Sequence, residues 1–118
     1  MSAADELRRR APHVAAVYEE TRRTVLEDGV VERELKALCA RALGGIDVTA
    51  RTERERAALD WAEAIAYDSD RADDTLWRRL HANFAEPELV ELGYSIAIAL
   101  GQQHWLATHG IVEPGAAP

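Results

Sequence analysis

Apolar residues recur at helical spacing along most of the chain, and the longest apolar run lies near its C-terminal end. There is no charged side chain between Leu92 and Gly101. A helix in this region is apolar on nearly every face, so neighbouring elements must cover it. Pro87 suits the first turn of a helix and Gly110 suits a left-handed cap after the last turn. The pattern therefore predicts a central helix over residues 87–108.

Two stripes on this helix predict how it packs. Gly93, Ala97 and Gly101 recur every four residues, so they form one line of small side chains that another backbone can approach closely. The adjacent stripe carries the larger side chains Leu89, Leu92, Ile96 and Leu100. We expect a partner helix along the small stripe and the hydrophobic core along the large one.

Four shorter helices are predicted before the central one. Each shows apolar residues at helical spacing, and they lie between Pro12 and Gly29, from Glu32 to Leu43, from Thr52 to Ala66 and from Thr75 to Phe84. No stretch alternates in the manner of a strand between hairpin turns. The sequence therefore predicts an all-α fold, a bundle of five helices around the apolar C-terminal one.

The ends of these helices carry recognisable signals. Thr52 and Glu55 have the spacing of a capping box, in which each side chain accepts a hydrogen bond from the backbone of the other residue. Asp73 and Asp74 supply an N-cap and favourable charge for the following helix. Gly29 and the pair Gly44-Gly45 end two of the helices.

The length of 118 residues fits one domain. We predict a flexible N-terminus over residues 1–11, a single helical domain over residues 12–110 and a flexible tail over residues 111–118, which is rich in Pro, Gly and Ala. Leucine, valine and the other hydrophobic residues make up 47% of the chain and charged residues 30%, as in an ordinary globular protein.

Charge and cysteine content narrow the classes of function. A net charge of −7 opposes attraction to nucleic acids and to anionic membranes, so neither is expected as a partner. No signal-peptide pattern or membrane-length apolar run is present, and the cytoplasm is the default location. Cys39 is the only cysteine, which excludes an internal disulfide. It lies on the apolar face of its helix and is expected to be a small buried residue.

One cluster of uncharged polar residues lies on the central helix, directly after the apolar run. Gln102, Gln103 and His104 could form the polar end of a pocket lined by Tyr94, Leu100 and Trp105. An imidazole titrates near neutral pH, so His104 is a candidate acid or base. Alternatively, these side chains satisfy helix ends or face a subunit partner, which is the reading we favour.

No metal or cofactor is expected. No two of the four histidines, His13, His81, His104 and His109, have the i, i+4 spacing of a helical metal site.

Several segments together resemble the carboxymuconolactone decarboxylase and alkylhydroperoxidase-D-like superfamily. They are Glu-Leu-Lys-Ala-Leu at 34–38, Arg-Glu-Arg-Ala-Ala-Leu-Asp-Trp at 54–61, and Glu-Leu-Val-Glu-Leu at 88–92 before an apolar helix. The resemblance is clearest from Glu53 to Gly110 and implies an all-α fold that assembles through its helices. It also implies, for members with decarboxylase or related activity, cofactor-free chemistry on small carboxylated ring compounds.

The thiol peroxidase site of that family is missing here. Family members with this activity carry Cys-x-x-Cys followed by His, and the corresponding positions are Ile46, Thr49 and Glu53. Glu34 alone matches, at the position of the proton-relay glutamate that the resemblance implies. The short connection between Gly45 and the capping box indicates that the catalytic helix is deleted. Peroxidase activity needs a low-pKa thiolate, which this segment lacks.

Three functions follow as hypotheses. The favoured one is a family member that has lost the thiol site and acts as an oligomeric binding or structural protein, a homo-oligomer held by apolar helices and able to take a small-molecule ligand. The second is a cofactor-free lyase or isomerase that uses His104 and Glu34 on a small carboxylated compound. The third is an accessory subunit that completes the site of a larger partner.

Overall fold

The computed structural model describes residues 1–112, and this range contains helices and connections but no strand. The predicted all-α class is confirmed. Within these residues there are six α-helices: α1 (Ala3–Arg9), α2 (Pro12–Thr21), α3 (Arg33–Leu43), α4 (Glu53–Tyr67), α5 (Asp74–Asn83) and α6 (Glu86–Thr108). A π-helical stretch η1 (Arg22–Glu27) continues α2, and a 3-10 turn η2 (Ser69–Arg71) follows α4. The expected number of five helices is corrected to six, because α1 precedes them.

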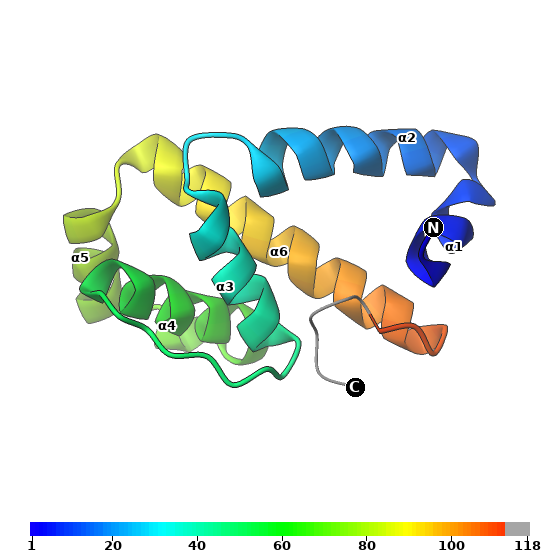
Figure 1. Ribbon diagram of the computed structural model, residues 1–118. Helices are drawn as coiled ribbons and strands as arrows, with labels where there is room; N and C mark the ends of the chain where they lie inside the picture. The colour runs from blue at the N-terminus through cyan, green and yellow to red at the C-terminus, as the bar shows by residue number, and fades with distance from the viewer. Residues whose placement is uncertain (113–118) are drawn as a thin grey trace.

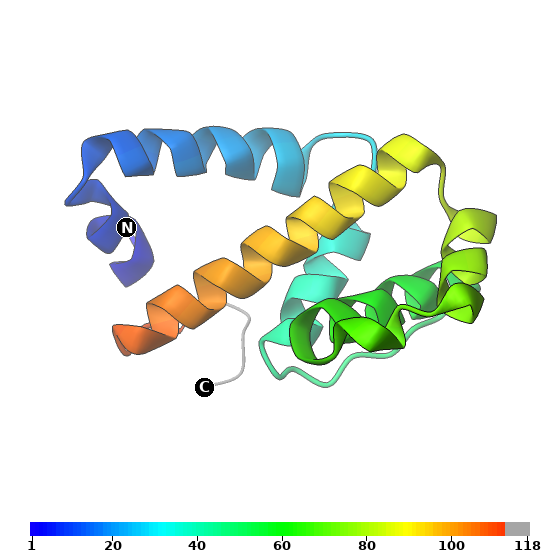
Figure 2. The same cartoon turned by 180° about the vertical axis from the view of Figure 1, so that it is seen from behind.

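The long helix α6 runs diagonally through the molecule (Figure 1). Helix α3 crosses it and lies with α4 and α5 on one side, while α1, α2 and η1 lie on the other side (Figure 2). We call residues 3–27, which form α1, α2 and η1, the N-terminal arm. No helix within residues 1–112 has the length and hydropathy needed to cross a membrane.

The hydrophobic core lies where α6 meets α3, α4 and α5. Leu92 and Ile96 are 0% and 1% exposed, Leu89 is buried and Leu100 is half-buried, which confirms the large stripe predicted on this helix. The buried residues that surround them are Leu35 and Cys39 of α3, Ala57, Ala58, Trp61 and Ala62 of α4, and Leu76 and Leu80 of α5. Small alanines on α4 allow this helix to pack closely.

The predicted stripe of small residues is only partly covered. At Gly93 an added Cβ would lie 2.7 Å from Cη2 of Trp61, so this glycine gives space to an indole of α4. Ala97 and Gly101 are exposed, and nothing lies within 4 Å of a Cβ built at Gly101. Within residues 1–112 no partner helix lies against Gly101, so the expectation of one along the whole stripe is wrong for the part of the chain that the structure describes.

The predicted signals are confirmed at two helix N-termini and at the C-terminus of α6. Thr52 and Glu55 form the capping box of α4, and the carboxylate of Asp73 accepts a hydrogen bond from the Leu76 N–H at 2.9 Å. Gly110 has a φ of 70°, and the Ile111 N–H closes the end of α6 by donating to the Leu106 carbonyl. These local signals depend on near neighbours alone, which explains their reliability.

The N-terminus differs from the expectation. We predict a flexible segment over residues 1–11, whereas the structure has helix α1 there, started by a capping box between Ser2 and Asp5. Ala4 and Arg8 are 1% and 4% exposed. The predicted flexible tail begins at Ile111, and residues 113–118 lie outside the described residues.

A buried ion pair attaches the N-terminal arm to the bundle. The ammonium group of Lys36 on α3 donates to the Val25 carbonyl at 2.5 Å, to the Asp28 carbonyl at 2.6 Å and to the Glu91 carboxylate of α6 at 3.2 Å. The same carboxylate accepts from the N–H groups of Val30 and Val31 at 3.1 and 2.6 Å. We call Lys36, Glu91 and these four backbone groups the clamp. It joins the end of η1, α3 and α6 at one point.

The charged state of Glu91 is favoured in the clamp. Burial alone would raise the pKa of this carboxyl, but the hydrogen bonds from Val31 and Val30 and the charge of Lys36 outweigh it, and its pKa lies below the ordinary value of 4.5. Its contribution to stability is therefore present above pH 4.5 and is lost as the pH falls through the lower pKa of the folded protein.

Substitution of this carboxylate tests the clamp. Glu91→Gln keeps the shape of the side chain but leaves the buried Lys36 ammonium without its counter-charge, and we expect a loss of about 3 kcal/mol in the free energy of unfolding at pH 7. Urea unfolding at several pH values measures it. The gap between the wild type and the variant should shrink as the pH falls below 4.5.

Glu86→Gln, on the same helix, is the matched control for Glu91→Gln. Glu86 is exposed and pairs only with the exposed His81, so its removal should change stability by less than about 0.5 kcal/mol. An equal and pH-independent loss in both variants would contradict the role given to the clamp.

Candidate functional site

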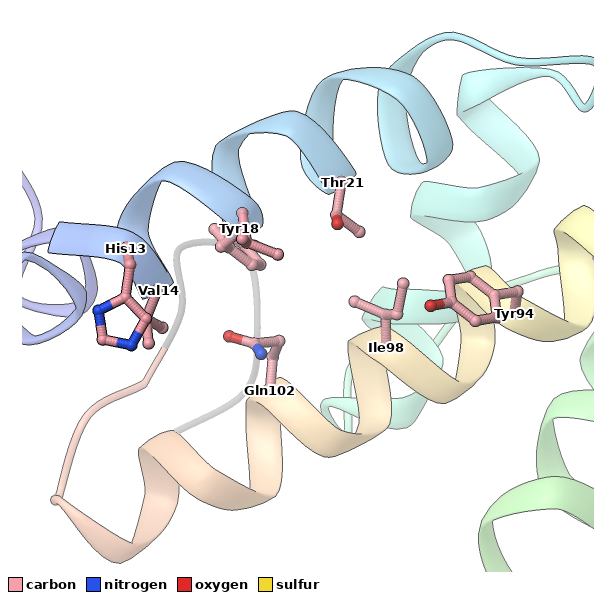
Figure 3. A pocket seen from close by; sticks show the side chains of 8 residues that line it. His13, Val14, Tyr18, Thr21, Tyr94, Ile98 and Gln102 are labelled. Carbon is pink, nitrogen blue, oxygen red and sulfur yellow. The ribbon is translucent and has the colours of Figure 1, made fainter. Parts of the chain in front are cut away.

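An open groove of about 340 Å³ lies between the N-terminal arm and α6. Its lining comes from α2 and α6 alone and consists of His13, Val14, Val17, Tyr18, Thr21, Tyr94, Ile98 and Gln102. In Figure 3 Thr21 of α2 points toward Ile98 of α6, and Tyr18 of α2 lies opposite Gln102 of α6. None of the lining residues is Asp, Glu, Lys or Arg, although these four types make up 30% of the chain.

Helix α2 lies along the groove without being packed into the molecule. It has no buried residue. Val14 and Val17 are 41% and 65% exposed, and Tyr94 on the facing helix is 59% exposed. Large apolar side chains on both walls are therefore in contact with solvent, where a packed helix pair would bury them.

One end of the groove is closed by a polar contact between α1 and α6. The guanidinium of Arg8 donates to Oε1 of Gln102 through Nε at 3.2 Å and Nη2 at 2.8 Å. The same guanidinium lies 3.6 Å from the ring centre of Tyr18 on α2, in a cation–π arrangement. Gln102 therefore holds α1 against α6 and lines the groove.

Gln103 serves a different neighbour. Its Nε2 donates to the Ala40 carbonyl at 2.9 Å, in the last turn of α3, and this carbonyl also accepts from the Gly44 N–H at 3.0 Å. The two glutamines predicted to form one polar cluster thus point to different elements, α1 and α3. Successive residues on a helix are turned by about 100°, so the two side chains leave α6 in different directions.

The two predicted catalytic residues, Glu34 and His104, are not brought together. Both are exposed. Glu34 lies one turn or less from Lys36, which contacts Glu91, and His104 lies thirteen positions after Glu91 on α6. At a rise of about 1.5 Å per residue this is roughly 20 Å along the helix. No group of three or more His, Cys, Asp or Glu side chains that could hold a metal ion occurs among residues 1–112.

Of the predicted pocket residues, the structure places Tyr94 and Gln102 in the groove. Gln103 faces α3, and Trp105 is 37% exposed with its ring 5.7 Å from that of His109 in an edge-on arrangement. The sequence analysis missed the wall formed by α2. Its residues Val14, Val17, Tyr18 and Thr21 do follow helical spacing, but the pattern alone does not show that this face stays uncovered.

The single thiol lies inside the core. Cys39 is 1% exposed, and burial raises its pKa to about 12. At neutral pH the group is therefore a thiol and not the nucleophilic thiolate. The prediction that this residue is a small buried side chain is confirmed.

Comparisons of the chain with protein-family models, with curated proteins and with solved structures found no match. The resemblance to the carboxymuconolactone decarboxylase-like superfamily therefore stays a prediction.

Substitution of the two glutamines separates their roles. Gln102→Ala removes the acceptor of Arg8, and we expect amide protection over residues 3–9 to fall about tenfold because a hydrogen bond to a charged group contributes about 1.5 kcal/mol. Gln103→Ala should instead reduce protection at the end of α3. Hydrogen exchange measured by mass spectrometry distinguishes the two, and each variant is the control for the other. An identical change in both would show that the contacts are not specific.

The state of the thiol is tested by its reactivity. A thiol reagent at pH 7.5 should label Cys39 in the native protein at a rate limited by opening of the core, while the urea-unfolded chain reacts at once. Peroxide consumption should be the same in the wild type and in Cys39→Ala. Rapid labelling of the native protein would contradict the buried position.

Proposed function

We propose that this chain is a helical assembly protein of the carboxymuconolactone decarboxylase-like kind that lacks thiol peroxidase chemistry and associates through the apolar face between α2 and α6. The observation that carries the proposal is the lining of the groove. It is free of Asp, Glu, Lys and Arg and exposes Val14, Val17 and Tyr94, although charged residues make up 30% of the chain.

The physical argument rests on the cost of leaving such a face in water. Each valine-sized side chain gains about 1.5–3 kcal/mol on full burial, and half or more of this gain is still available at Val17. Contiguous exposed apolar surface commonly marks an interaction site. Charged residues are depleted in the centres of protein interfaces, as they are in this groove.

The thiol and acid–base alternatives have less support. Cys39 is buried with a raised pKa, and the positions of the family's cysteines hold Ile46 and Thr49. A lyase using Glu34 and His104 would need both groups at one substrate, and they lie on separate parts of the surface.

Binding of a small molecule is a second candidate, because the groove volume of about 340 Å³ is within the range of ligand sites. Its lining residues with polar groups are His13, Tyr18, Thr21, Tyr94 and Gln102, which could orient an uncharged or weakly polar compound. Its openness to solvent favours a partner helix over a small ligand, because ligand sites enclose most of the surface of what they bind.

Sedimentation velocity of the full chain tests the proposal. One chain has a mass of 13.1 kDa, and we expect a dimer or larger species to form as the concentration rises through the micromolar range. Association driven by apolar surface should persist in 0.5 M NaCl, because salt screens charge and does not weaken apolar contacts. A particle that stays at 13.1 kDa up to about 1 mM would contradict the proposal.

A further inference from the structure

We infer that the N-terminal arm opens as one unit: it releases from α6 at α1 and pivots at η1, while the clamp keeps its other end on the bundle. The arm passes from the beginning of α6, beside the clamp, to the end of α6, beside α1 (Figure 1). This motion lies within one chain, so it requires neither association of copies nor any occupant of the groove. It makes the width of the groove adjustable.

The middle of the N-terminal arm is not packed into the bundle. Helix α2 has no buried residue, and Val14 and Val17 are 41% and 65% exposed. An open groove of about 340 Å³ lies between this helix and α6. Movement of α2 away from α6 therefore uncovers no buried side chain of α2. Segments with few buried apolar contacts open at a lower free energy than the core, so the ends of the arm determine how readily it opens.

The clamp is the end that stays attached. The buried ammonium of Lys36 donates to the carbonyls of Val25 and Asp28 and to the carboxylate of Glu91. Release of the arm at this point would take two of these three acceptors away from a buried charge, which is costly. The chain from Val25 onward is therefore fixed, and the pivot lies before it.

The segment of the arm that enters the clamp is the π-helical stretch η1. The Asp28 N–H donates to the Arg23 carbonyl at 3.0 Å, five positions earlier. Sharp changes in helix direction occur at π-helical turns, which are frequent at functional sites. The Thr24 hydroxyl also donates to the Glu20 carbonyl at 2.7 Å, and this kind of bond bends helices. The arm is therefore able to change direction between Glu20 and Val25.

The α1 end is the one that can release. The guanidinium of Arg8 donates to Oε1 of Gln102 at 3.2 and 2.8 Å, and the buried Ala4 lies outside the main hydrophobic core. A helix of seven residues is not stable by itself, so α1 stays folded only while it is docked. After release, Arg8 and Gln102 both lie in water, where each finds new hydrogen bonds. Neither is left buried without a partner, in contrast to Lys36 in an opened clamp.

Opening couples the position of the arm to the occupancy of the groove. In the closed form Gln102 lines the groove while its oxygen is bonded to Arg8. A molecule that touches both walls, for example Val17 of α2 and Tyr94 of α6, stabilises the closed arm. A molecule that binds α6 alone and takes the oxygen of Gln102 competes with Arg8 and stabilises the open arm.

Amide hydrogen exchange, followed residue by residue by NMR, tests the opening. Gln102→Ala removes the acceptor of Arg8, and exchange in α1 and α2 should rise together by about tenfold. The Val30 and Val31 amides donate to Glu91 in the clamp, and their exchange should stay within about twofold of the wild type.

Gln103→Ala is the matched control. It removes the neighbouring glutamine, which bonds to Ala40 of α3, and should leave exchange in α1 and α2 unchanged. Circular dichroism verifies that both variants keep the helical fold. Exchange is measured at two protein concentrations, because a motion within one chain does not depend on concentration and association does.

A distance measurement detects the motion itself. Spin labels on Ala16→Cys of α2 and Thr108→Cys of α6, both exposed positions, are placed in a Cys39→Ala chain, which has no other thiol. Double electron–electron resonance should give a main distance and a longer minor one. Gln102→Ala should raise the ratio of the minor to the main population by about tenfold.

The inference is supported by a joint rise of exchange in α1 and α2, with the clamp amides unchanged and the longer distance enriched. A rise confined to α1 means fraying of that helix with α2 in place, and it overturns the inference, as does an unchanged distance distribution. Loss of protection at Val30 and Val31 moves the release to the clamp and also overturns it. A chain that stays monomeric and opens in this way contradicts the proposed function alone, whereas an associating chain whose arm stays closed in Gln102→Ala contradicts the inference alone.

Discussion

The buried ammonium group of Lys36 is the point on which the arrangement of this molecule depends. It has three hydrogen-bond donors, and the structure supplies three acceptors, the carbonyls of Val25 and Asp28 and the carboxylate of Glu91. All the other basic residues of the chain except the histidines are arginines, so lysine is used only here. A compact ammonium fits between three converging oxygens, whereas the planar fork of a guanidinium is suited to two parallel ones.

Gly29 shows how closely the chain is fitted around the clamp. Its φ is +90°, and an added Cβ would collide with the carboxylate of Glu91. Both the left-handed backbone and the lack of a side chain are therefore required at this position. The turn at residues 28–31 brings the backbone N–H groups of Val30 and Val31 onto Glu91, and it thereby sets the direction in which the N-terminal arm leaves the bundle.

The groove is a consequence of fixing the N-terminal arm at its two ends. The clamp holds the arm where η1 ends, and the contact between Arg8 and Gln102 holds it at α1. Ala4 of α1 and Leu106 of α6 are buried near this second contact but lie outside the main hydrophobic core. Helix α2 spans the distance between these two attachments and has no buried residue of its own. The space beneath it is thus set by the positions of the attachments and not by side chains packed within it.

Much of the fold could be predicted from local patterns, and the parts that could not depend on contacts between distant residues. The helices with long apolar faces and their caps at Thr52, Asp73 and Gly110 follow from spacing and near neighbours. Helix α1 has only seven residues, too few to be stable alone, and it depends on docking against α6. Its capping box at Ser2 and Asp5 is present in the sequence, but such a short signal does not by itself establish a helix.

In the candidate site, too, local patterns could be predicted from the sequence and contacts between distant residues could not. Gln102 and Gln103 both make specific hydrogen bonds, but their partners are 94 and 63 residues away in the sequence. The sequence does not show where α3 crosses α6. The hypothesis that Glu34 and His104 act together could therefore not be rejected from the sequence alone. Lys36 and Glu91, separated by 55 residues, were overlooked for that reason, although a single lysine next to an apolar helix face was a usable signal.

The uncovered face of α6 follows from the number of helices available to surround it. A helix of 23 residues is roughly 35 Å long and, being apolar on most sides from Leu92 to Gly101, needs neighbours all round. Helices α3, α4 and α5 cover one side, and the N-terminal arm stands away from the other except at its ends. The connection over residues 44–52 contains no helix that could fill the remaining side. The exposed apolar side chains of α2 and α6 therefore follow from how few helices surround α6, and they are the surface that the proposed association would bury.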